Sequence, residues 1–412
     1  YSNGISIANA QHNIMLNGDN LNPSPATSMW ADYGMPSILG GIALPDPGNP
    51  NEYYLFYLSV RMGDLAGDTL FMAKIDMTLD GGLGGVIVKD YVVSNSGFMC
   101  GQLSACKHGN GRDWWLTLHG FNNDKYYKWL ITPSGISSPS FQHIGLVKSY
   151  PIQGVFSPNG EKYGSYDNNY ELELMDFDRC TGMFSNYINV YIPDNTVSNG
   201  CSFSPNSNLF YFSARNYLFQ VDVTSSNVAS TVDTVAIWDG FLDPISTQFV
   251  YQQLAPDNKI YITGFGSVQH LTVINYPDSL GTACNVAQHS IVLPGKNNGS
   301  MPNYPFYELG AMGGTICDSL STYLTELVFN STTFQVFPNP ATEYIYITND
   351  LYNKIRSIEI YNLQGQKIIS KEISNYEQFN LIDLNEISTG FFEVLIFTEK
   401  DVFRKKFVKN TH

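Results

Sequence analysis

The chain has 412 residues, with 37 Asp and Glu against 22 Lys and Arg, and a formal net charge of −15. This balance argues against a nucleic-acid-binding protein, because phosphate binding needs clustered Lys and Arg. The length suggests two or three domains. Hydrophobic residues reach 43% and aromatic residues 14%, while charged residues make up only 14%, a composition that favours an all-β protein outside the cytosol.

The chain opens on Tyr1-Ser2-Asn3-Gly4-Ile5, which reads as the end of a strand followed by a turn. We therefore expect the start of the native protein, including any signal peptide, to lie before Tyr1. Residues 1–37 contain further short strands with Asn-Gly turn chemistry. No apolar run reaches the roughly 18 residues that a membrane-spanning helix needs.

One phrase recurs: Phe156-Ser157-Pro158-Asn159-Gly160, Phe203-Ser204-Pro205-Asn206-Ser207 and Leu254-Ala255-Pro256-Asp257-Asn258. Its copies begin at residues 156, 203 and 254, so the spacing is 47 and then 51 residues. Pro followed by a turn-forming pair predicts a hairpin connection. A repeat of this length between short strands is typical of a propeller or solenoid.

Around these turns the sequence divides into units of four predicted strands, each matching one propeller blade. The units span residues 39–93, 102–147, 154–192, 200–239 and 252–293. Residues 1–37 and 298–318 remain at the two ends, and we expect them to pair in one closing blade. We predict a β-propeller over residues 1–318, with seven blades preferred and six possible once the missing start is restored.

Acidic residues end three of the predicted third strands, at Asp76, Asp178 and Asp222. Each precedes a turn, so we interpret these carboxylates as turn caps.

The six cysteines lack the Cys-x-x-Cys spacing of zinc or thioredoxin sites. An even number in an apparently extracellular chain favours disulfides. We predict sequential pairing, with six free thiols as the alternative: Cys100 with Cys106, Cys180 with Cys201, and Cys284 with Cys317.

A change in composition marks the end of the propeller. Residues 333–412 hold 9 basic and 10 acidic residues, which leaves 13 and 27 for residues 1–332. A polar linker over 319–332 is followed by short alternating strands, so residues 333–412 predict a small Ig-like β-sandwich.

Four phrases of this second domain carry a family resemblance: Phe337-Pro338-Asn339-Pro340-Ala341-Thr342, Tyr361-Asn362-Leu363-Gln364-Gly365-Gln366, Leu384-Asn385-Glu386-Ile387-Ser388-Thr389-Gly390 and Phe403-Arg404-Lys405-Lys406-Phe407-Val408-Lys409. In this order they resemble the type A sorting domain of the Bacteroidetes type IX secretion system. The resemblance implies export through the outer-membrane translocon and transfer to an outer-membrane carrier barrel. It also implies cleavage of the domain and attachment to a lipopolysaccharide-type anchor. The sorting-signal residues are then Phe337, Pro338, Asn339, Pro340, Asn362, Gly365, Gly390, Arg404, Lys405 and Lys406.

The propeller resembles those of proteins that such bacteria export. The phrases that carry this likeness are the Ser-Pro-Asn turns, Asn110-Gly111-Arg112-Asp113-Trp114-Trp115 and Met301-Pro302-Asn303-Tyr304-Pro305. The resemblance supplies no catalytic motif.

Catalytic signatures of serine hydrolases, zinc proteases, P-loops and dinucleotide-binding folds are missing from the sequence. We therefore predict no cofactor, no metal site and no catalytic residue. The alternative is a carbohydrate-active enzyme that uses paired carboxylates at the propeller mouth. Its candidate acids are Asp113, Asp167, Glu171, Glu173, Asp176 and Asp178.

Four Asp-Ser/Thr-apolar triplets match the pattern that Bacteroidetes O-glycosylate, at Thr69, Thr234, Ser279 and Ser319. Together these features predict an exported cell-surface or extracellular protein. Its propeller would be a non-enzymatic module for adhesion, or for a filament or sheath. The expected partners are the translocon and carrier barrel through residues 333–412, and a second copy or a surface glycan or protein through the propeller.

Overall fold

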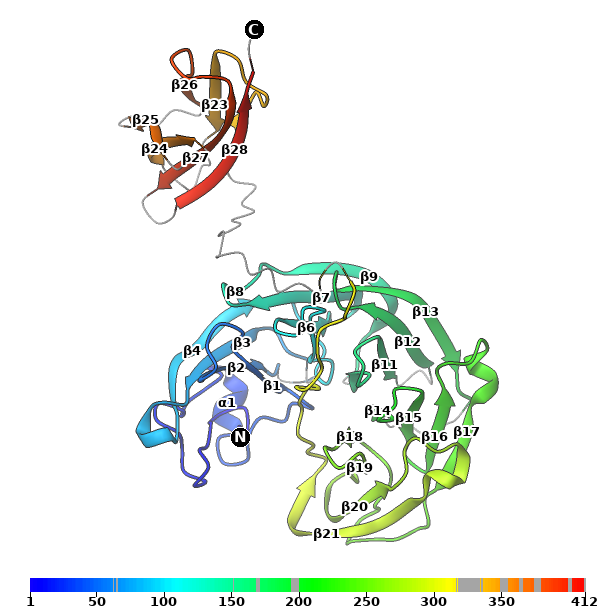
Figure 1. The fold of residues 1–412 in the computed structure, drawn as a ribbon. Helices are drawn as coiled ribbons and strands as arrows, with labels where there is room; N and C mark the ends of the chain where they lie inside the picture. The colour runs from blue at the N-terminus through cyan, green and yellow to red at the C-terminus, as the bar shows by residue number, and fades with distance from the viewer. Residues whose placement is uncertain are drawn as a thin grey trace. The chain divides into compact units, whose positions relative to one another are not determined.

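The structure is a computed structural model in which the chain forms two compact units, residues 1–320 and 321–412 (Figure 1). It describes residues 1–61, 63, 66–150, 152–167, 171–193, 200–315, 317, 334, 336–348, 355–362, 366–373, 379–398 and 402–410. The predicted linker 319–332 lies outside these residues. Each unit is described by itself.

The first unit is a β-propeller of consecutive antiparallel sheets, whose strands pair in chain order (Figure 1). Blade 1 holds β1 (Gly41–Pro45), β2 (Glu52–Leu58), β3 (Leu70–Asp76) and β4 (Gly85–Ser94). Blade 2 holds β5 (Ser104–Lys107), β6 (Trp114–His119), β7 (Asn123–Thr132), β8 (Gly135–Ile136) and β9 (Ser140–Lys148). Blade 3 holds β10 (Gly154–Phe156), β11 (Lys162–Tyr166), β12 (Glu171–Asp178) and β13 (Met183–Tyr191). Blade 4 holds β14 (Cys201–Phe203), β15 (Leu209–Ala214), β16 (Tyr217–Asp222) and β17 (Asp233–Ile237). Blade 5 holds β18 (Gln252–Leu254), β19 (Ile260–Ile262), β20 (Ser267–Ile274) and β21 (Val286–Asn298).

The described residues thus form five blades, each close to a predicted unit. The predicted count of six or seven blades included residues before Tyr1, so that count stays a prediction. The expected pairing of the two ends in one blade is wrong for the described residues. The N-terminal segment instead packs on blade 1, where Ile7, Met15 and Leu21 are buried against Tyr57 and Leu16 pairs with Gly85. It also holds the short helix α1 (Pro25–Met29).

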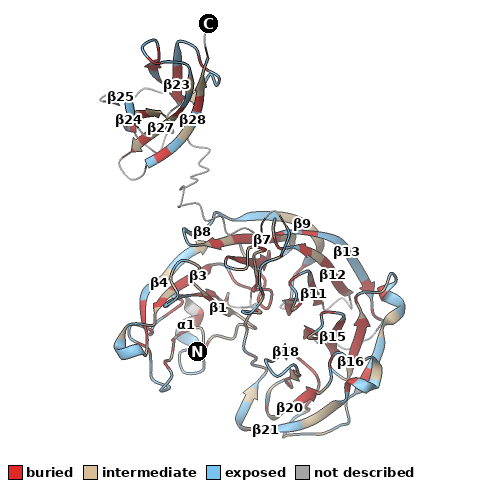
Figure 2. Cartoon of the chain, viewed as in Figure 1, coloured by how far each residue is buried: buried red, intermediate tan, exposed pale blue. Residues whose placement is uncertain are grey.

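The blades pack through large apolar side chains from both faces of their middle strands. Every residue of β6 and β15 is buried, whereas the outer strands β9, β13 and β21 are largely exposed (Figure 2). Trp114 and Trp129 are among the largest fully buried side chains. Trp115, the neighbour of Trp114, is buried as well.

The recurring phrase forms the turn between the first two strands of blades 3, 4 and 5. In each copy the second residue closes the turn with backbone hydrogen bonds, as in Ser157 N–H to Lys162 O and Gly160 N–H to Ser157 O. The last residue adopts positive φ: 75° at Gly160, 65° at Ser207 and 62° at Asn258. This requirement explains the Gly, Ser or Asn there.

The predicted aspartate caps are also confirmed. Asp76 Oδ1 accepts hydrogen bonds from the amide and hydroxyl of Thr78, and Asp222 Oδ1 accepts the same pair from Thr224. Asp178 accepts from the Cys180 amide and the Thr181 hydroxyl. These acids therefore stabilise turns.

The second unit is a small β-sandwich, as predicted. One sheet has the order β22 (Val336–Phe337), β23 (Tyr344–Thr348), β26 (Phe379–Asp383). The other has the order β25 (Lys367–Glu372), β24 (Ile355–Asn362), β27 (Gly390–Thr398), β28 (Val402–Lys409). Alternating residues of both sheets, such as Ile345, Ile358 and Val394, form one buried core.

Candidate functional site

The centre of a propeller is its usual candidate site, and here the chain itself fills it. A cavity at the centre touches all five inner strands, through residues such as Ile42, Ala105, Val155, Phe203 and Leu254. Residues 303–306 form the rest of its wall, and the volume of this cavity is about 30 Å³. That volume holds one or two water molecules, whereas small-molecule pockets usually measure roughly 300–1,000 Å³. None of the residues lining this cavity is Asp, Glu or His.

Residues 299–315, here called the channel segment, run through this centre. Asn303 Nδ2 donates to Leu39 O and Leu103 O, just before the inner strands β1 and β5 begin. The Tyr304 hydroxyl donates to Leu254 O at the end of β18. Met312 N–H donates to Gly109 O, beyond the end of β5. The segment therefore enters where inner strands begin and leaves where they end.

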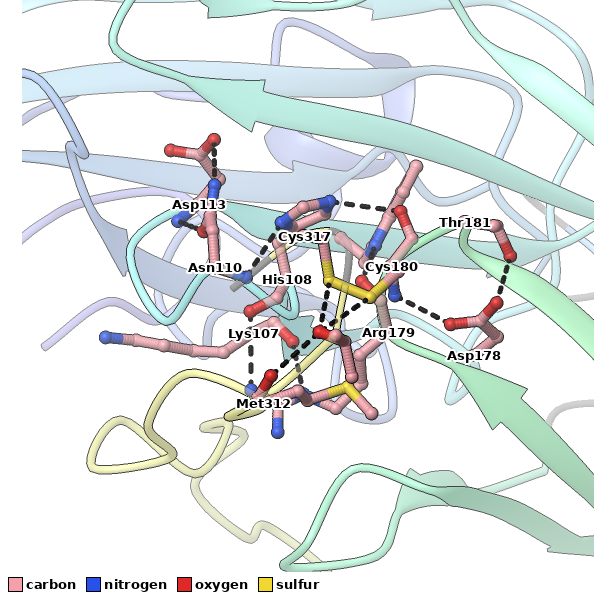
Figure 3. The surroundings of a disulfide bond; sticks show 12 residues. Lys107, His108, Asn110, Asp113, Asp178, Arg179, Cys180, Thr181, Met312 and Cys317 are labelled. Carbon is pink, nitrogen blue, oxygen red and sulfur yellow. Dashed lines mark hydrogen bonds between the residues drawn. A yellow bond between two sulfur atoms is a disulfide. The ribbon is translucent and has the colours of Figure 1, made fainter. Parts of the chain in front are cut away.

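A disulfide between Cys180 and Cys317 lies at the exit of the channel segment, with Cα atoms 5.6 Å apart (Figure 3). The sequential pairing that we expected is wrong. Cys180 lies at one end of β13, a strand of nine residues, and Cys201 follows after its other end. At about 3.3 Å per residue that strand alone measures roughly 30 Å, whereas a disulfide needs Cα atoms closer than about 7 Å.

The other four cysteines are buried thiols: Cys100, Cys106, Cys201 and Cys284. Cys201 Sγ donates to Gln153 O inside the core. Burial raises the pKa of Cys106 to about 12, so this thiol stays protonated and unreactive.

The disulfide packs against the turn between β5 and β6. Gly109 lies so close that a Cβ there would overlap Cys317 Sγ and lie 2.9 Å from Cys180 Sγ. Gly111 has φ of 73°, and its Cβ would lie 2.6 Å from the Ala311 nitrogen. His108 Nδ1 accepts from the Asn110 amide, so Nε2 carries the proton and donates to Cys180 O (Figure 3). Asn110-Gly111-Arg112-Asp113 is therefore a structural motif.

Arg179 joins this turn to the channel segment. Its guanidinium donates to the carbonyl oxygens of Lys107, His108 and Gly310. Burial lowers the pKa of Arg179, but a guanidinium remains charged in proteins. The charge is thus solvated by three carbonyl dipoles from two segments far apart in sequence, residues 107–108 and residue 310.

The candidate carboxylates lie outside the cavity lining. Asp113 accepts from Arg112 and Asn110, and Asp176 binds Lys162. Asp167 accepts from the Glu171 amide. Burial, and then the charge of Asp167, raise the pKa of Glu171.

Glu173 belongs to a buried polar cluster between blades 2 and 3. It forms an ion pair with Lys148, and both side chains are almost completely buried. Lys148 also donates to Tyr126 and Ser165. Burial alone would raise the pKa of Glu173, but the charge and hydrogen bond of Lys148 hold it below the usual value. Sequence inspection did not single out Lys148, because its partner lies 25 residues away.

His119 lies in the same cluster. Its Nδ1 donates to Gly120 O over 2.7 Å, while Nε2 is buried without a hydrogen-bond partner in the described part of the chain. Burial, and then the charge of Lys148, lower the pKa of His119 to about 3. The imidazole is therefore neutral in the folded protein.

The predicted glycosylation positions differ in exposure. Thr234 on β17 is exposed, whereas Thr69 and Ser279 are half-buried. Ser319 lies outside the described residues. Glycosylation at these positions stays a prediction.

In the second unit, the predicted sorting residues surround the last strand. Asn339 donates through Nδ2 to Lys406 O and accepts through Oδ1 from Val408 N–H, which fixes the Phe337–Pro340 phrase to β28. Pro338 and Pro340 follow cis peptide bonds. Lys409, the last residue of the Phe403–Lys409 phrase, donates to Leu384 O and Ile387 O in the turn before β27.

The remaining sorting residues divide into surface and turn positions. Arg404 and Lys406 are exposed on β28 and Lys405 is half-buried, with Arg404 3.5 Å from Glu393. Asn362 accepts from the Gln366 amide across a hairpin turn. Gly390 begins β27, and Gly365 lies outside the described residues.

Neither a metal site nor a membrane helix is found in the described residues. No group of three or more His, Cys, Asp or Glu there could hold a metal ion. No helix there is long and apolar enough to cross a membrane.

Comparison with known proteins identifies residues 335–410 as a secretion system C-terminal sorting domain. No curated protein matches the chain. Among solved structures, a Lactobacillus plantarum protein is 16% identical over 69% of this chain and 90% of its own, with a TM-score of 0.38. A quinonprotein alcohol dehydrogenase-like protein from Bacteroides thetaiotaomicron is 11% identical over 67% of this chain and 57% of its own, with a TM-score of 0.35. Sqt1 from Chaetomium thermophilum is 9% identical over 80% of this chain and 72% of its own, with a TM-score of 0.37.

Likenesses this distant carry no argument about function. The sorting-domain match does carry such an argument, because a sorting domain directs export. The chain is a secreted protein that the type IX system sorts to the cell surface or the extracellular space.

Proposed function

We propose that the propeller is a non-enzymatic module for adhesion or for an extracellular filament or sheath, which the sorting unit delivers to the surface of a Bacteroidetes cell. The observation that carries this proposal is the channel segment in the propeller's centre. A carbohydrate-active enzyme on this scaffold would need an open mouth with converging acids. The centre instead holds Asn303 and Tyr304, and the cavity that they line measures about 30 Å³.

Two further features support the proposal. The carboxylates Asp113, Asp176 and Glu173 already bind positively charged or amide groups within the fold. The outer strands expose apolar side chains such as Tyr91, Phe141 and Tyr191, each more than half exposed. Exposed apolar surface of this kind suits contacts with other molecules.

The test separates a structural subunit from an enzyme. Surface assemblies should be purified from the native cells and analysed by mass spectrometry, and we expect stoichiometric propeller peptides. The purified full chain should also be incubated with a polysaccharide panel, and we expect no release of reducing ends. Turnover that disappears in the Asp113→Asn or Glu171→Gln variant would contradict the proposal and establish the carbohydrate-active alternative.

A further inference from the structure

One face of the smaller sheet in the sorting unit carries exposed apolar side chains. Its strands β22, β23 and β26 alternate, as strands do, between the core and the outside. The inward residues Ile345, Ile347 and Ile382 are 0%, 0% and 2% exposed. The outward residues should then be polar, because that side of the sheet is not part of the core.

Four of the outward residues are instead aromatic or aliphatic. Phe337, Tyr346 and Leu381 lie directly opposite one another across the three strands. The rings of Phe337 and Tyr346 are 5.7 Å apart, and those of Tyr344 and Tyr346 are 5.3 Å apart. Phe337, Tyr344 and Leu381 are 38%, 42% and 47% exposed. We call Phe337, Tyr344, Tyr346 and Leu381 the aromatic row.

The other sheet of the unit differs in chemistry. Its outer strand β28 presents Arg404 and Lys406 to solvent, and β24 and β25 carry the Glu359–Lys367 ion pair. The aromatic row carries no charge, with Asp383 next to it as the residue opposite Tyr344. Contiguous apolar side chains at a surface mark an interaction site.

We propose that the aromatic row is the surface by which the sorting unit docks on an apolar groove of a protein component of the type IX secretion system. The sorting-domain match includes all four residues, and such a domain acts by being recognised by the secretion machinery. Tyr and Phe are enriched where protein interfaces bury their core.

Phe337 supports this assignment within its own phrase. Asn339 holds the phrase to β28, and Ala341 is buried in the core. The Phe337 ring lies on the outer face. The inference deepens the sorting role and does not depend on the propeller's proposed function.

The first experiment uses the full chain in a type IX-competent strain that lacks its own copy. The Tyr346→Thr/Leu381→Thr variant keeps strand-compatible residues and removes two members of the row. We expect at least a fivefold fall in surface and released protein, with accumulation in the periplasm. The matched control is Phe391→Thr, because Phe391 is 62% exposed on the other sheet; it should be exported normally. Normal export of the double variant would overturn the proposal.

A second measurement holds even if that variant fails to fold. A photo-crosslinking amino acid replaces Tyr344 in the otherwise unchanged chain, and the crosslinked partner is identified by mass spectrometry. We expect a component of the secretion system. Crosslinks confined to the propeller of the same chain or to a second copy would overturn the proposal. An error about the propeller's role would change neither result.

Discussion

Cys180 and Cys317 are bonded across 137 positions of sequence, and their bond closes the path of the channel segment through the propeller. The bond joins the turn between β12 and β13 to the end of that segment. Residues 181–316 are therefore enclosed in one covalent loop. This places the whole of blades 4 and 5 between two fixed points on the side of blade 3.

The Cys180→Ala/Cys317→Ala variant should lower the free energy of unfolding of the propeller. A loop of this length is expected to contribute about 5 kcal/mol by restricting the unfolded chain. Urea unfolding followed by tryptophan fluorescence measures the loss. A reductant should reproduce it in the native chain and have no effect on the variant. Peptide mapping that finds Cys180 bonded to Cys201 would contradict the structure.

Gly111→Ala should release the channel segment. The new Cβ would meet the Ala311 nitrogen at 2.6 Å in addition to the backbone strain at φ of 73°. Gly240→Ala is the matched control, because Gly240 also has positive φ but nothing within 4 Å. Both variants carry roughly 1–2 kcal/mol of backbone strain. Only Gly111→Ala should speed chymotrypsin cleavage after Phe306 or Tyr307. Equal cleavage rates in the two variants would contradict the close packing of Gly111 on the channel segment.

Glu173→Gln should destabilise the propeller strongly, since it leaves the buried Lys148 ammonium without its counter-ion. Losing one member of such a pair typically costs about 3–5 kcal/mol. The Lys148→Met/Glu173→Leu variant should recover most of that stability, because apolar groups then replace both charges. Thermal unfolding of the three proteins measures the difference. A double variant as unstable as the single one would contradict this account.

His119 should make stability fall in mild acid. Its pKa is lowered to about 3 in the folded protein, while the unfolded chain binds a proton below about 6.5. Between these values only the unfolded state gains the proton, so stability falls by up to about 1.4 kcal/mol per pH unit. We expect a loss of about 2 kcal/mol between pH 6.5 and 5 from this group. His119→Gln should flatten the profile, and His143→Gln, at an exposed histidine, controls for replacing an imidazole.

Asn339→Ala should weaken both folding and export of the sorting unit. The change removes the hydrogen bonds to Lys406 O and Val408 N–H that hold the Phe337–Pro340 phrase on β28. Two such bonds contribute roughly 1–3 kcal/mol. Asn385→Ala, in an exposed turn of the same unit, is the control. Periplasmic retention of the full chain measures the effect, and unchanged export would contradict it.

The sequence alone was enough to predict the propeller, the sandwich and the sorting role. The propeller and the sandwich follow from local chemistry: turn residues with positive φ, strands of alternating burial, and aspartates that bind amides two residues away. The sorting role came from the resemblance of four phrases to a known family. Such interactions join neighbours in the chain, so the order of residues reveals them. The turn at Phe156–Gly160 and the cap at Asp222 are examples.

Only the tertiary structure decided what fills the centre. Asn303 meets Leu39 across 264 positions, and Cys180 meets Cys317 across 137. The same holds for the aromatic row, whose members meet across strands. Contacts of this kind depend on where each blade or strand lies in space, and no local pattern encodes that. The sequence therefore determined the architecture and the export signal, while three-dimensional packing placed the channel segment and its disulfide at the propeller's core.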